Sequence, residues 1–429
     1  MRTIIALLFC AATVAFSQTK KIRGVVEDFD TRAPLPFATI TLADSTFGTF
    51  ANNEGEFLLT TGSLPTSITV SYIGHQSDTL RIDEEMLNAP IKILLKREEI
   101  VLPEVQVFAT DSFAVAVIKQ VYKNISDAAG NEVTGDGFYS QYTKVDSQYT
   151  EILQMFFRSL LNSQGIVDND VQQGRYARLK ISSHDSSGGP FWFTNFSFLT
   201  TNTFKLMEAK DSFFSFLPFV PKAFAYIPIR PDPEKYYYLK TEGLYSSNER
   251  RVAVIRCMAR SGLDRPAFSG TVDVDLKDMQ VIKVDWELPG WVGFFHYKSP
   301  TYEMTNFLWT YKAGFDRTFN NEYVMKFLNT TLSFDINSKH DPSNKKQWSF
   351  QSFLTFYRYE SKVVSKPGAS TKEKFDIGKI IRAGYDPAFW NYHKDFVSAI
   401  PTEQSIKESF IKHGFYGNLF PGGEPLNEK

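Results

Sequence analysis

The feature that most constrains the fold is a repeated pattern of short alternating runs separated by polar turns. Gly270–Leu276 and Val281–Leu288 flank the turn Lys277–Gln280, and apolar side chains recur at about every second position in both runs. A period of two indicates strands with one buried face. Similar strand–turn–strand patterns occur within residues 138–157, 236–258 and 302–359. The pattern predicts a mostly β protein in which successive strands pair antiparallel.

The first 17 residues have the composition of a secretory signal peptide. Arg2 precedes an apolar run from Ile4 to Phe16, which ends at the small residue Ser17. This run is shorter than the ~20 residues of a membrane-spanning helix. Cys10 lacks the small preceding residue that lipidation requires. We therefore expect residues 1–17 to be removed, with a retained anchor as the alternative. The mature chain would be exported to the periplasm or associated with the outer membrane, soluble or peripherally attached.

Charge and cysteine content exclude several function classes. Loss of Arg2 changes the formal net charge from −1 to −2, so the chain lacks the basic excess that binds nucleic acid. Cys257 would be the one cysteine left, which excludes an intramolecular disulfide and a thiolate metal cluster. It lies in the apolar run Val252–Met258, which indicates a buried small side chain. The 39 Phe, 20 Tyr and 6 Trp favour sheets over helices.

Residues 19–108 predict a small seven-strand-type β-sandwich, because six or seven short alternating runs are separated by Gly, Pro and Asn turns. In the stretch Gly48–Leu59, Asn52 and Gly55 suit turn positions since both tolerate a left-handed backbone. Phe57 then begins the next strand. We interpret these polar turn residues as scaffold.

Several turn glycines and a Pro-Leu pair follow one another in a set order: Gly24, Pro34, Leu35, Gly48, Asn52, Gly55, Phe57 and Gly74. In this order the region resembles the carboxypeptidase-regulatory-like domain, a transthyretin-like β-sandwich. Leu102–Val107 is similar to the segment that ends such modules at the head of TonB-dependent outer-membrane transporters. The resemblance implies a structural or docking element of the Gram-negative envelope, without catalysis.

Residues 109–365 predict one packed helix followed by a larger antiparallel curved sheet or half-barrel. The helix is expected over residues 111–128, where apolar residues recur at helical spacing. The strand–turn–strand patterns around Tyr236–Gly243 and Phe268–Asp275 are faintly similar to envelope proteins with the lipoprotein-carrier half-barrel. Residues 366–429 are expected to form a tail with a short helix, and Trp390 to dock this tail on the sheet.

Four carboxylates alternate along two neighbouring runs, at Asp273, Asp275, Asp285 and Glu287, with Lys283 among them. They would lie opposite the apolar face on which Ile282 and Trp286 are expected. Clustered carboxylates are typical of Ca²⁺ sites, but the favoured interpretation is a solvated strand face. We therefore expect no metal site.

An aromatic segment, broken by prolines, extends from Phe191 to Ile229. It is too apolar for an ordinary exposed loop, and two interpretations remain open: a lid over the core, or a patch that binds a lipid or partner. The residues of this candidate patch are Phe191, Trp192, Phe193, Phe213, Phe214, Phe216 and Phe219.

The chain contains none of the common catalytic motifs, neither Gly-x-Ser-x-Gly nor His-Glu-x-x-His nor a phosphate loop. The sequence therefore predicts a non-catalytic envelope protein without a cofactor, which binds a lipid, lipoprotein or outer-membrane protein through its β-rich domain. One alternative is an assembly adaptor that docks through the N-terminal sandwich. Another is a hydrolase with an unrecognised site that includes His184 and Asp185.

Overall fold

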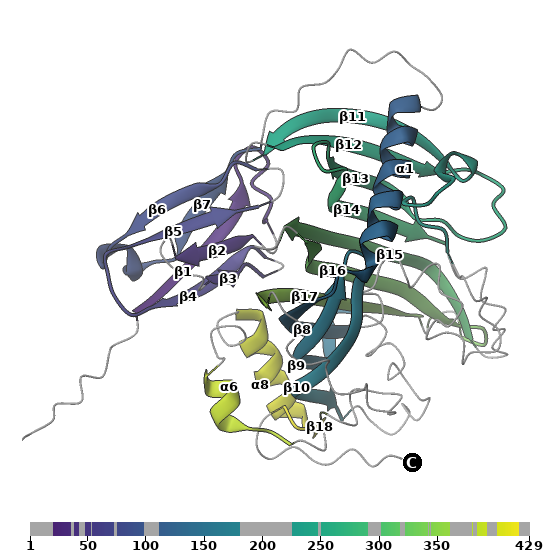
Figure 1. Ribbon diagram of the computed structural model, residues 1–429. Coiled ribbons are helices and arrows are strands. Elements are labelled where there is room, and N and C mark those ends of the chain that lie inside the picture. The colour runs from purple at the N-terminus through teal and green to yellow at the C-terminus, as the bar shows by residue number, and fades with distance from the viewer. Residues whose placement is uncertain are drawn as a thin grey trace, which may run out of the picture. The chain divides into compact units, whose positions relative to one another are not determined.

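In the computed structural model the chain forms two compact units, which are described separately below (Figure 1). The first contains the described residues up to Tyr72 and residues 77–96; the second contains most of the chain from Arg97 onward. The expected signal peptide and the domain boundaries expected at residues 108 and 365 lie outside the described residues. The structure describes residues 20–35, 38–42, 48–52, 54–72, 75–97, 111–180, 225–247, 250–290, 302–317, 322–341, 343, 345–360, 380, 384–392 and 401–419.

The described residues of the N-terminal unit form seven short strands and one 3-10 helix. They are β1 Lys20–Asp28, β2 Thr39–Leu42, β3 Gly48–Phe50, β4 Glu56–Thr61, β5 Thr66–Ser71, β6 Asp78–Ile82, η1 Glu85–Asn88 and β7 Ile91–Leu95. The strands form two sheets, with orders β4-β1-β7 and β3-β2-β5-β6. Both sheets contribute to one core, with Ile22 and Phe57 from the first and Ile40 and Val70 from the second. This is the expected β-sandwich.

The turn between β3 and β4 shows why its residue types are needed. Asn52 Oδ1 accepts hydrogen bonds from the backbone N–H groups of Glu54 (3.0 Å) and Glu56 (2.7 Å). Gly55 has a φ of 76°, and a Cβ there would lie 2.4 Å from the carbonyl oxygen of Val26. The turn residues therefore serve backbone geometry, as the sequence indicated.

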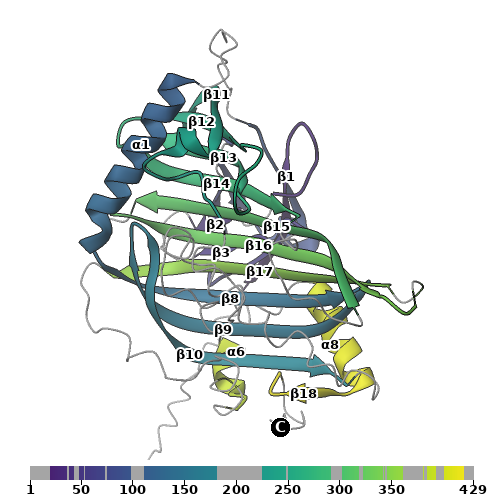
Figure 2. The same cartoon turned by 90° about the vertical axis from the view of Figure 1, so that its right-hand side faces the viewer.

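In the described part of the second unit, 11 strands form one antiparallel sheet. They are β8 Val133–Val145, β9 Gln148–Asn162, β10 Gly165–Leu179, β11 Tyr237–Ser247, β12 Arg250–Ala259, β13 Ser269–Asp275, β14 Gln280–Pro289, β15 Tyr302–Arg317, β16 Tyr323–Ser338, β17 Lys345–Glu360 and β18 Phe415–Gly417. Their order is β11-β12-β13-β14-β15-β16-β17-β8-β9-β10-β18. The sheet is curved and open, with β11 and β18 at its edges (Figure 2). The predicted hairpins are confirmed.

One hairpin departs from simple alternation. Asp273 pairs with Lys283 and Val274 with Val281, which leaves Ile282 as the extra residue of a β-bulge. Val281 joins the main core, whereas Ile282 packs in a separate cluster with side chains of β11 and β12. The expectation that Ile282 shares the core face of β14 is therefore wrong, because one extra residue reverses the alternation.

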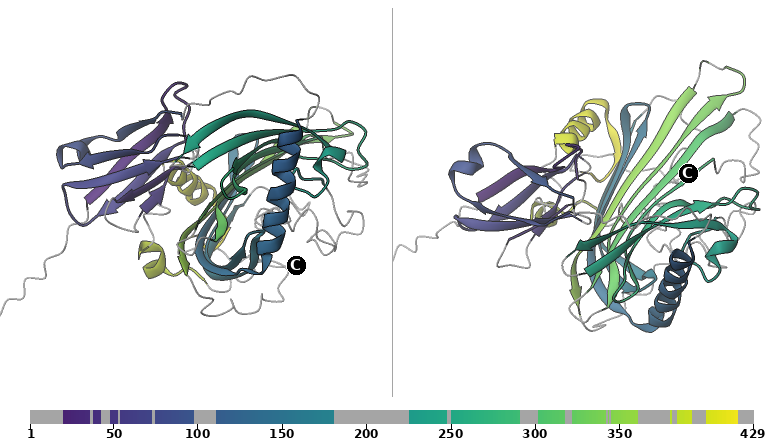
Figure 3. Two further views of the ribbon diagram at one scale, coloured as in Figure 1. Left: turned by 45° about the horizontal axis from the view of Figure 1, so that its top comes forward. Right: turned by 90° about the horizontal axis from the view of Figure 1, so that it is seen from above.

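Among the described residues, the helices of this unit are α1 Ser112–Asp127, η2 Ala128–Gly130, η4 Pro233–Lys235, α6 Pro387–Tyr392 and α8 Pro401–His413. α1 lies within the curve of the sheet (Figure 3). Asp111 caps it by accepting a hydrogen bond from the N–H of Phe113. The predicted helix is confirmed, with Ala114, Val117, Ile118, Val121 and Ile125 buried. None of the helices in the described ranges combines the length and apolarity needed to cross a membrane.

α1 is attached to the sheet along its whole length. At its start, the N–H of Asp111 donates to the carbonyl of Leu239 on β11 (2.9 Å). Near its end, Asn124 Nδ2 donates to the carbonyl of Asp278 (3.0 Å). Ser163 Oγ, in the turn between β9 and β10, donates to the carbonyl of Ile125 (2.7 Å). α1 is therefore an integral part of the fold that reaches from the β11 edge to the β9–β10 turn.

The tail packs on the sheet through two helices. Trp390 of α6 is 3% exposed, and its ring centroid lies 5.7 Å from that of Phe156 on β9, as the sequence led us to expect. Ile406 and Phe410 of α8 join a cluster with Leu179 of β10. These contacts cover part of the face opposite α1.

Candidate functional site

A row of directly paired residues crosses seven strands on the concave face of the large sheet. Each member pairs with the next, so their side chains share one face. All are at most 4% exposed. We call this set the concave row: Trp286, Tyr311, Thr330, Ser352, Gln141, Leu153 and Tyr176. Polar groups thus replace apolar ones on the face that also carries the main core.

Hydrogen bonds stabilise the middle of the concave row. Gln141 Oε1 accepts from the hydroxyl of Tyr139 (2.8 Å) and from Ser352 Oγ (3.5 Å). Trp309 Nε1 donates to Thr330 Oγ1 (2.6 Å). A buried polar group without a hydrogen-bond partner lowers the stability of the fold. These hydrogen bonds therefore explain how an apolar core tolerates the polar side chains of the concave row.

A buried carboxylate lies at the β10 end of the concave row. The hydroxyl of Tyr176 donates to Glu151 Oε1 (2.8 Å), and Glu151 is 1% exposed. Burial, and then the adjacent Glu151, raise the pKa of Tyr176 well above its ordinary value. The phenol is therefore a fixed hydrogen-bond donor. With no histidine among its members, the concave row suits hydrogen bonding better than proton transfer.

The β11 side of this core, against which α1 packs, contains polar atoms without partners. In the part of the chain that the structure describes, Trp286 Nε1 and the Tyr237 hydroxyl have no hydrogen-bond partner. Cys257 is fully buried in the same core, and burial raises the pKa of its thiol. This confirms the interpretation of Cys257 as a buried small side chain.

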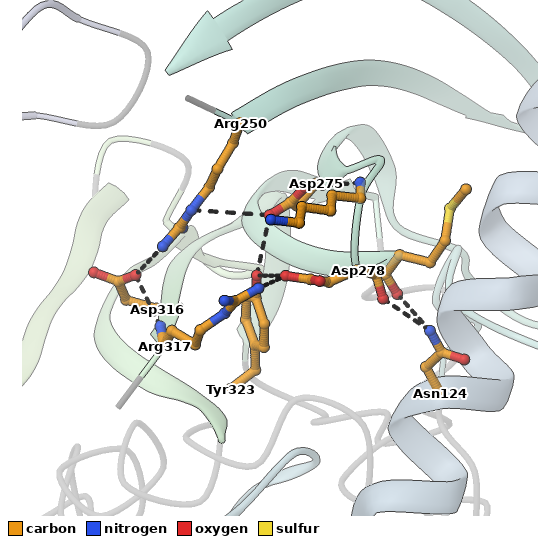
Figure 4. A network of polar contacts seen from close by, with 9 residues as sticks. Asn124, Arg250, Asp275, Asp278, Asp316, Arg317 and Tyr323 are labelled. Atoms are coloured by element: carbon orange, nitrogen blue, oxygen red, sulfur yellow. Dashed lines mark hydrogen bonds and ion pairs between the residues drawn. The ribbon is translucent and has the colours of Figure 1, made fainter. Parts of the chain in front are cut away.

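A separate network of polar contacts holds the turn after β13 (Figure 4). Asp275 is 0% exposed and accepts a hydrogen bond from the hydroxyl of Tyr323 (3.1 Å), while Arg250 Nε lies 3.8 Å away. Arg317 forms an ion pair with Asp278, whose carbonyl also receives the hydrogen bond from α1. Since these charges are balanced and already paired, we interpret the network as a structural tie between α1 and two hairpins.

The four carboxylates of β13 and β14 do not share one environment. Glu287 is exposed and Asp285 half-buried, as a solvated face requires, but Asp273 and Asp275 are 8% and 0% exposed. The solvated-face interpretation is therefore wrong for the β13 pair, because the hydroxyls of Tyr245 and Tyr323 cover them. Within the described ranges, no group of three or more His, Cys, Asp and Glu side chains is placed to hold a metal ion.

The other residues singled out in the sequence fall into two sets. Gly24, Pro34, Leu35, Gly48, Asn52, Gly55 and Phe57 lie in the N-terminal unit, where Leu35 and Phe57 are core residues. Outside the described residues lie Gly74, the candidate patch Phe191, Trp192, Phe193, Phe213, Phe214, Phe216 and Phe219, and the pair His184 and Asp185.

One family model matches the N-terminal part of the chain. Residues 22–107 match the family model described as a CarboxypepD_reg-like domain. The expected resemblance is confirmed, over about a fifth of the sequence. No curated protein matches the chain.

Several solved structures resemble this chain only distantly. A DUF1329 family protein from Desulfovibrio piger is 7% identical, with 59% of this chain and 95% of that chain covered and a TM-score of 0.21. A domain described as an outer membrane lipoprotein-sorting protein from Vibrio parahaemolyticus is 9% identical, with 58% of this chain and 92% of that chain covered and a TM-score of 0.24. A chain of the Pseudomonas aeruginosa MucA/MucB complex is 9% identical, with 55% of this chain and 93% of that chain covered and a TM-score of 0.18. These TM-scores are too low to establish a shared fold.

The sequence prediction missed the concave row. Thr330 lies between Leu328 and Leu332, and Ser352 between Phe350 and Leu354. Each is a polar residue at a position where its strand alternation is apolar, which is a usable signal. The row itself depends on the pairing of β17 with β8, which are far apart in the sequence.

Proposed function

We propose that this protein is an exported, non-catalytic binding protein of the Gram-negative envelope, and that its large sheet binds the acyl chain of a lipid or lipoprotein on the concave face. The observation that carries this proposal is the concave row. Binding sites for small molecules are mostly apolar, with a few placed polar groups that fix orientation. Gln141, Ser352 and Thr330 supply such groups among aromatic and aliphatic side chains.

The surroundings of the row support an amphipathic ligand. Phe307, Phe334 and Phe350 form a ladder on three strands, with successive ring centroids 6.5 and 5.9 Å apart. Such a ladder fits an apolar chain, while the Gln141 amide and the Ser352 hydroxyl would hydrogen-bond an ester, amide or carboxyl group. Since these groups are buried, a ligand reaches them only after neighbouring side chains move, so binding would be slow and strongly temperature-dependent.

Mass spectrometry of the purified mature protein, followed by binding of a fluorescent fatty acid, tests the proposal. The variant Gln141→Leu/Ser352→Ala should bind about tenfold more weakly, because hydrogen bonds to the ligand are lost. Thr331→Val, at the next position of β16 and half-buried, is the matched control and should bind normally. A wild-type protein that neither co-purifies with lipid nor binds the added acid contradicts the proposal and favours the adaptor that docks through the sandwich.

A further inference from the structure

Exposed apolar side chains gather around the edge strand β11. Tyr238 and Met258 pair directly across β11 and β12 and are 38% and 47% exposed. Phe113, in the first turn of α1, is 45% exposed. That turn is tied to the same edge by the hydrogen bond from Asp111 to Leu239, and Figure 2 shows α1 starting beside β11. Tyr238 and Met258 therefore lie on the face of β11 and β12 that points away from the core, and Phe113 lies at the start of α1, which is tied to the same edge from the core side.

Positive charge accompanies these side chains. Lys240 is exposed and follows Tyr238 on the same face of β11. The guanidinium of Arg260 lies 4.0 Å from the centroid of the Tyr238 ring. Neither cation forms an ion pair with a carboxylate among the described residues, whereas the neighbouring Arg256 is paired with Glu242. The edge is thus locally cationic on a chain whose net charge is −1.

We propose that the β11 edge and the start of α1 dock this protein peripherally on an anionic bilayer surface. Tyr238, Met258 and Phe113 would enter the headgroup region, and Lys240 and Arg260 would face anionic lipids. Interfacial segments combine aromatic and apolar side chains with Lys and Arg in this way, each cation adding attraction to an anionic leaflet. Three exposed apolar side chains make a small surface for a stable protein interface, which needs ~800 Å² from each partner.

Co-sedimentation with vesicles tests this docking without reference to the acyl-chain site. The mature protein should bind vesicles of phosphatidylethanolamine and phosphatidylglycerol, and the bound fraction should fall as salt is added. The variant Phe113→Ser/Tyr238→Ser/Met258→Ser should lower the partition coefficient by about tenfold or more. Lys240→Glu should weaken binding to anionic vesicles and leave the weak binding to phosphatidylcholine unchanged.

A matched control uses an exposed apolar residue and an exposed lysine on α8. Ile411→Ser/Lys412→Gln changes side chains of the same kinds away from β11 and should bind as the wild type does. Thermal unfolding verifies that each variant is folded. The proposal is overturned if the wild type fails to bind anionic vesicles, or if the triple variant binds as well as the control. In either case, retained fatty-acid binding would show that the acyl-chain site stands independently.

Discussion

The two strands of the β13–β14 hairpin carry carboxylates in the same alternating pattern but place them in different surroundings. On β13, Asp273 and Asp275 are buried beneath tyrosine hydroxyls. On β14, Asp285 is half-buried and Glu287 is exposed. Equal spacing in the sequence therefore does not mean equal burial. Contacts from other strands decide it, through Tyr245 of β11 and Tyr323 of β16.

The energetic consequence is a large asymmetry between the two strands. Removing one member of a buried ion pair leaves the other charge buried without a partner, and this destabilises a fold by several kcal/mol. An exposed ion pair contributes little because water and salt screen it. Asp275 is 0% exposed, whereas the side chain of Asp285 is 37% exposed in its pair with Lys312.

The largest difference should appear when each aspartate is truncated. Asp275→Ala removes the acceptor for the N–H of Lys277 and one of the two carboxylates within hydrogen-bond distance of the Tyr323 hydroxyl, and it leaves Arg250 with one fewer carboxylate. We expect the free energy of unfolding to fall by about 3 kcal/mol. Asp285→Ala is the control, with an expected loss below about 1 kcal/mol. Urea unfolding of both variants measures the difference, and equal losses would show that burial does not separate the two strands.

Local patterns predicted the elements of this fold well. The stripe from Ala114 to Ile125 predicted α1, and the alternation around Lys277–Gln280 predicted the β13–β14 hairpin, because both signals lie within one short segment. The bulge at Ile282 and the burial of Asp275 were not predictable, since they depend on register and on a tyrosine about 50 residues away in sequence. The concave row was missed for the same reason, as its members meet only through the full strand order.

Asp273, the other carboxylate of β13, should make the stability of the protein depend on pH. Burial raises the pKa of Asp273, while Lys283 partly opposes this. An aspartate with a raised pKa in the folded state favours folding when protonated. Its stabilising contribution is therefore complete below the ordinary aspartate pKa of about 4 and is lost as pH rises through the raised value.

The variant Asp273→Asn should remove this dependence, because the amide is neutral and can still accept from Tyr245. Relative to the wild type it should gain stability as pH rises from about 4 through the raised pKa of Asp273. Urea midpoints at several pH values measure the difference. A constant difference across this range would mean that the Asp273 pKa is the same in the folded and unfolded chain.

The smallest effect is expected on the solvated side of the hairpin. Lys312 Nζ lies 3.1 Å from Asp285 Oδ2, with both side chains at least one third exposed. A double-mutant cycle of Lys312→Ala and Asp285→Ala should give a coupling energy below about 0.5 kcal/mol, because an exposed pair is screened and loses side-chain entropy on forming. Salt should reduce it further. A coupling above about 1 kcal/mol that persists in salt would mean that this face of β14 is shielded from water, and the contrast with β13 would then rest on hydrogen bonding rather than on burial.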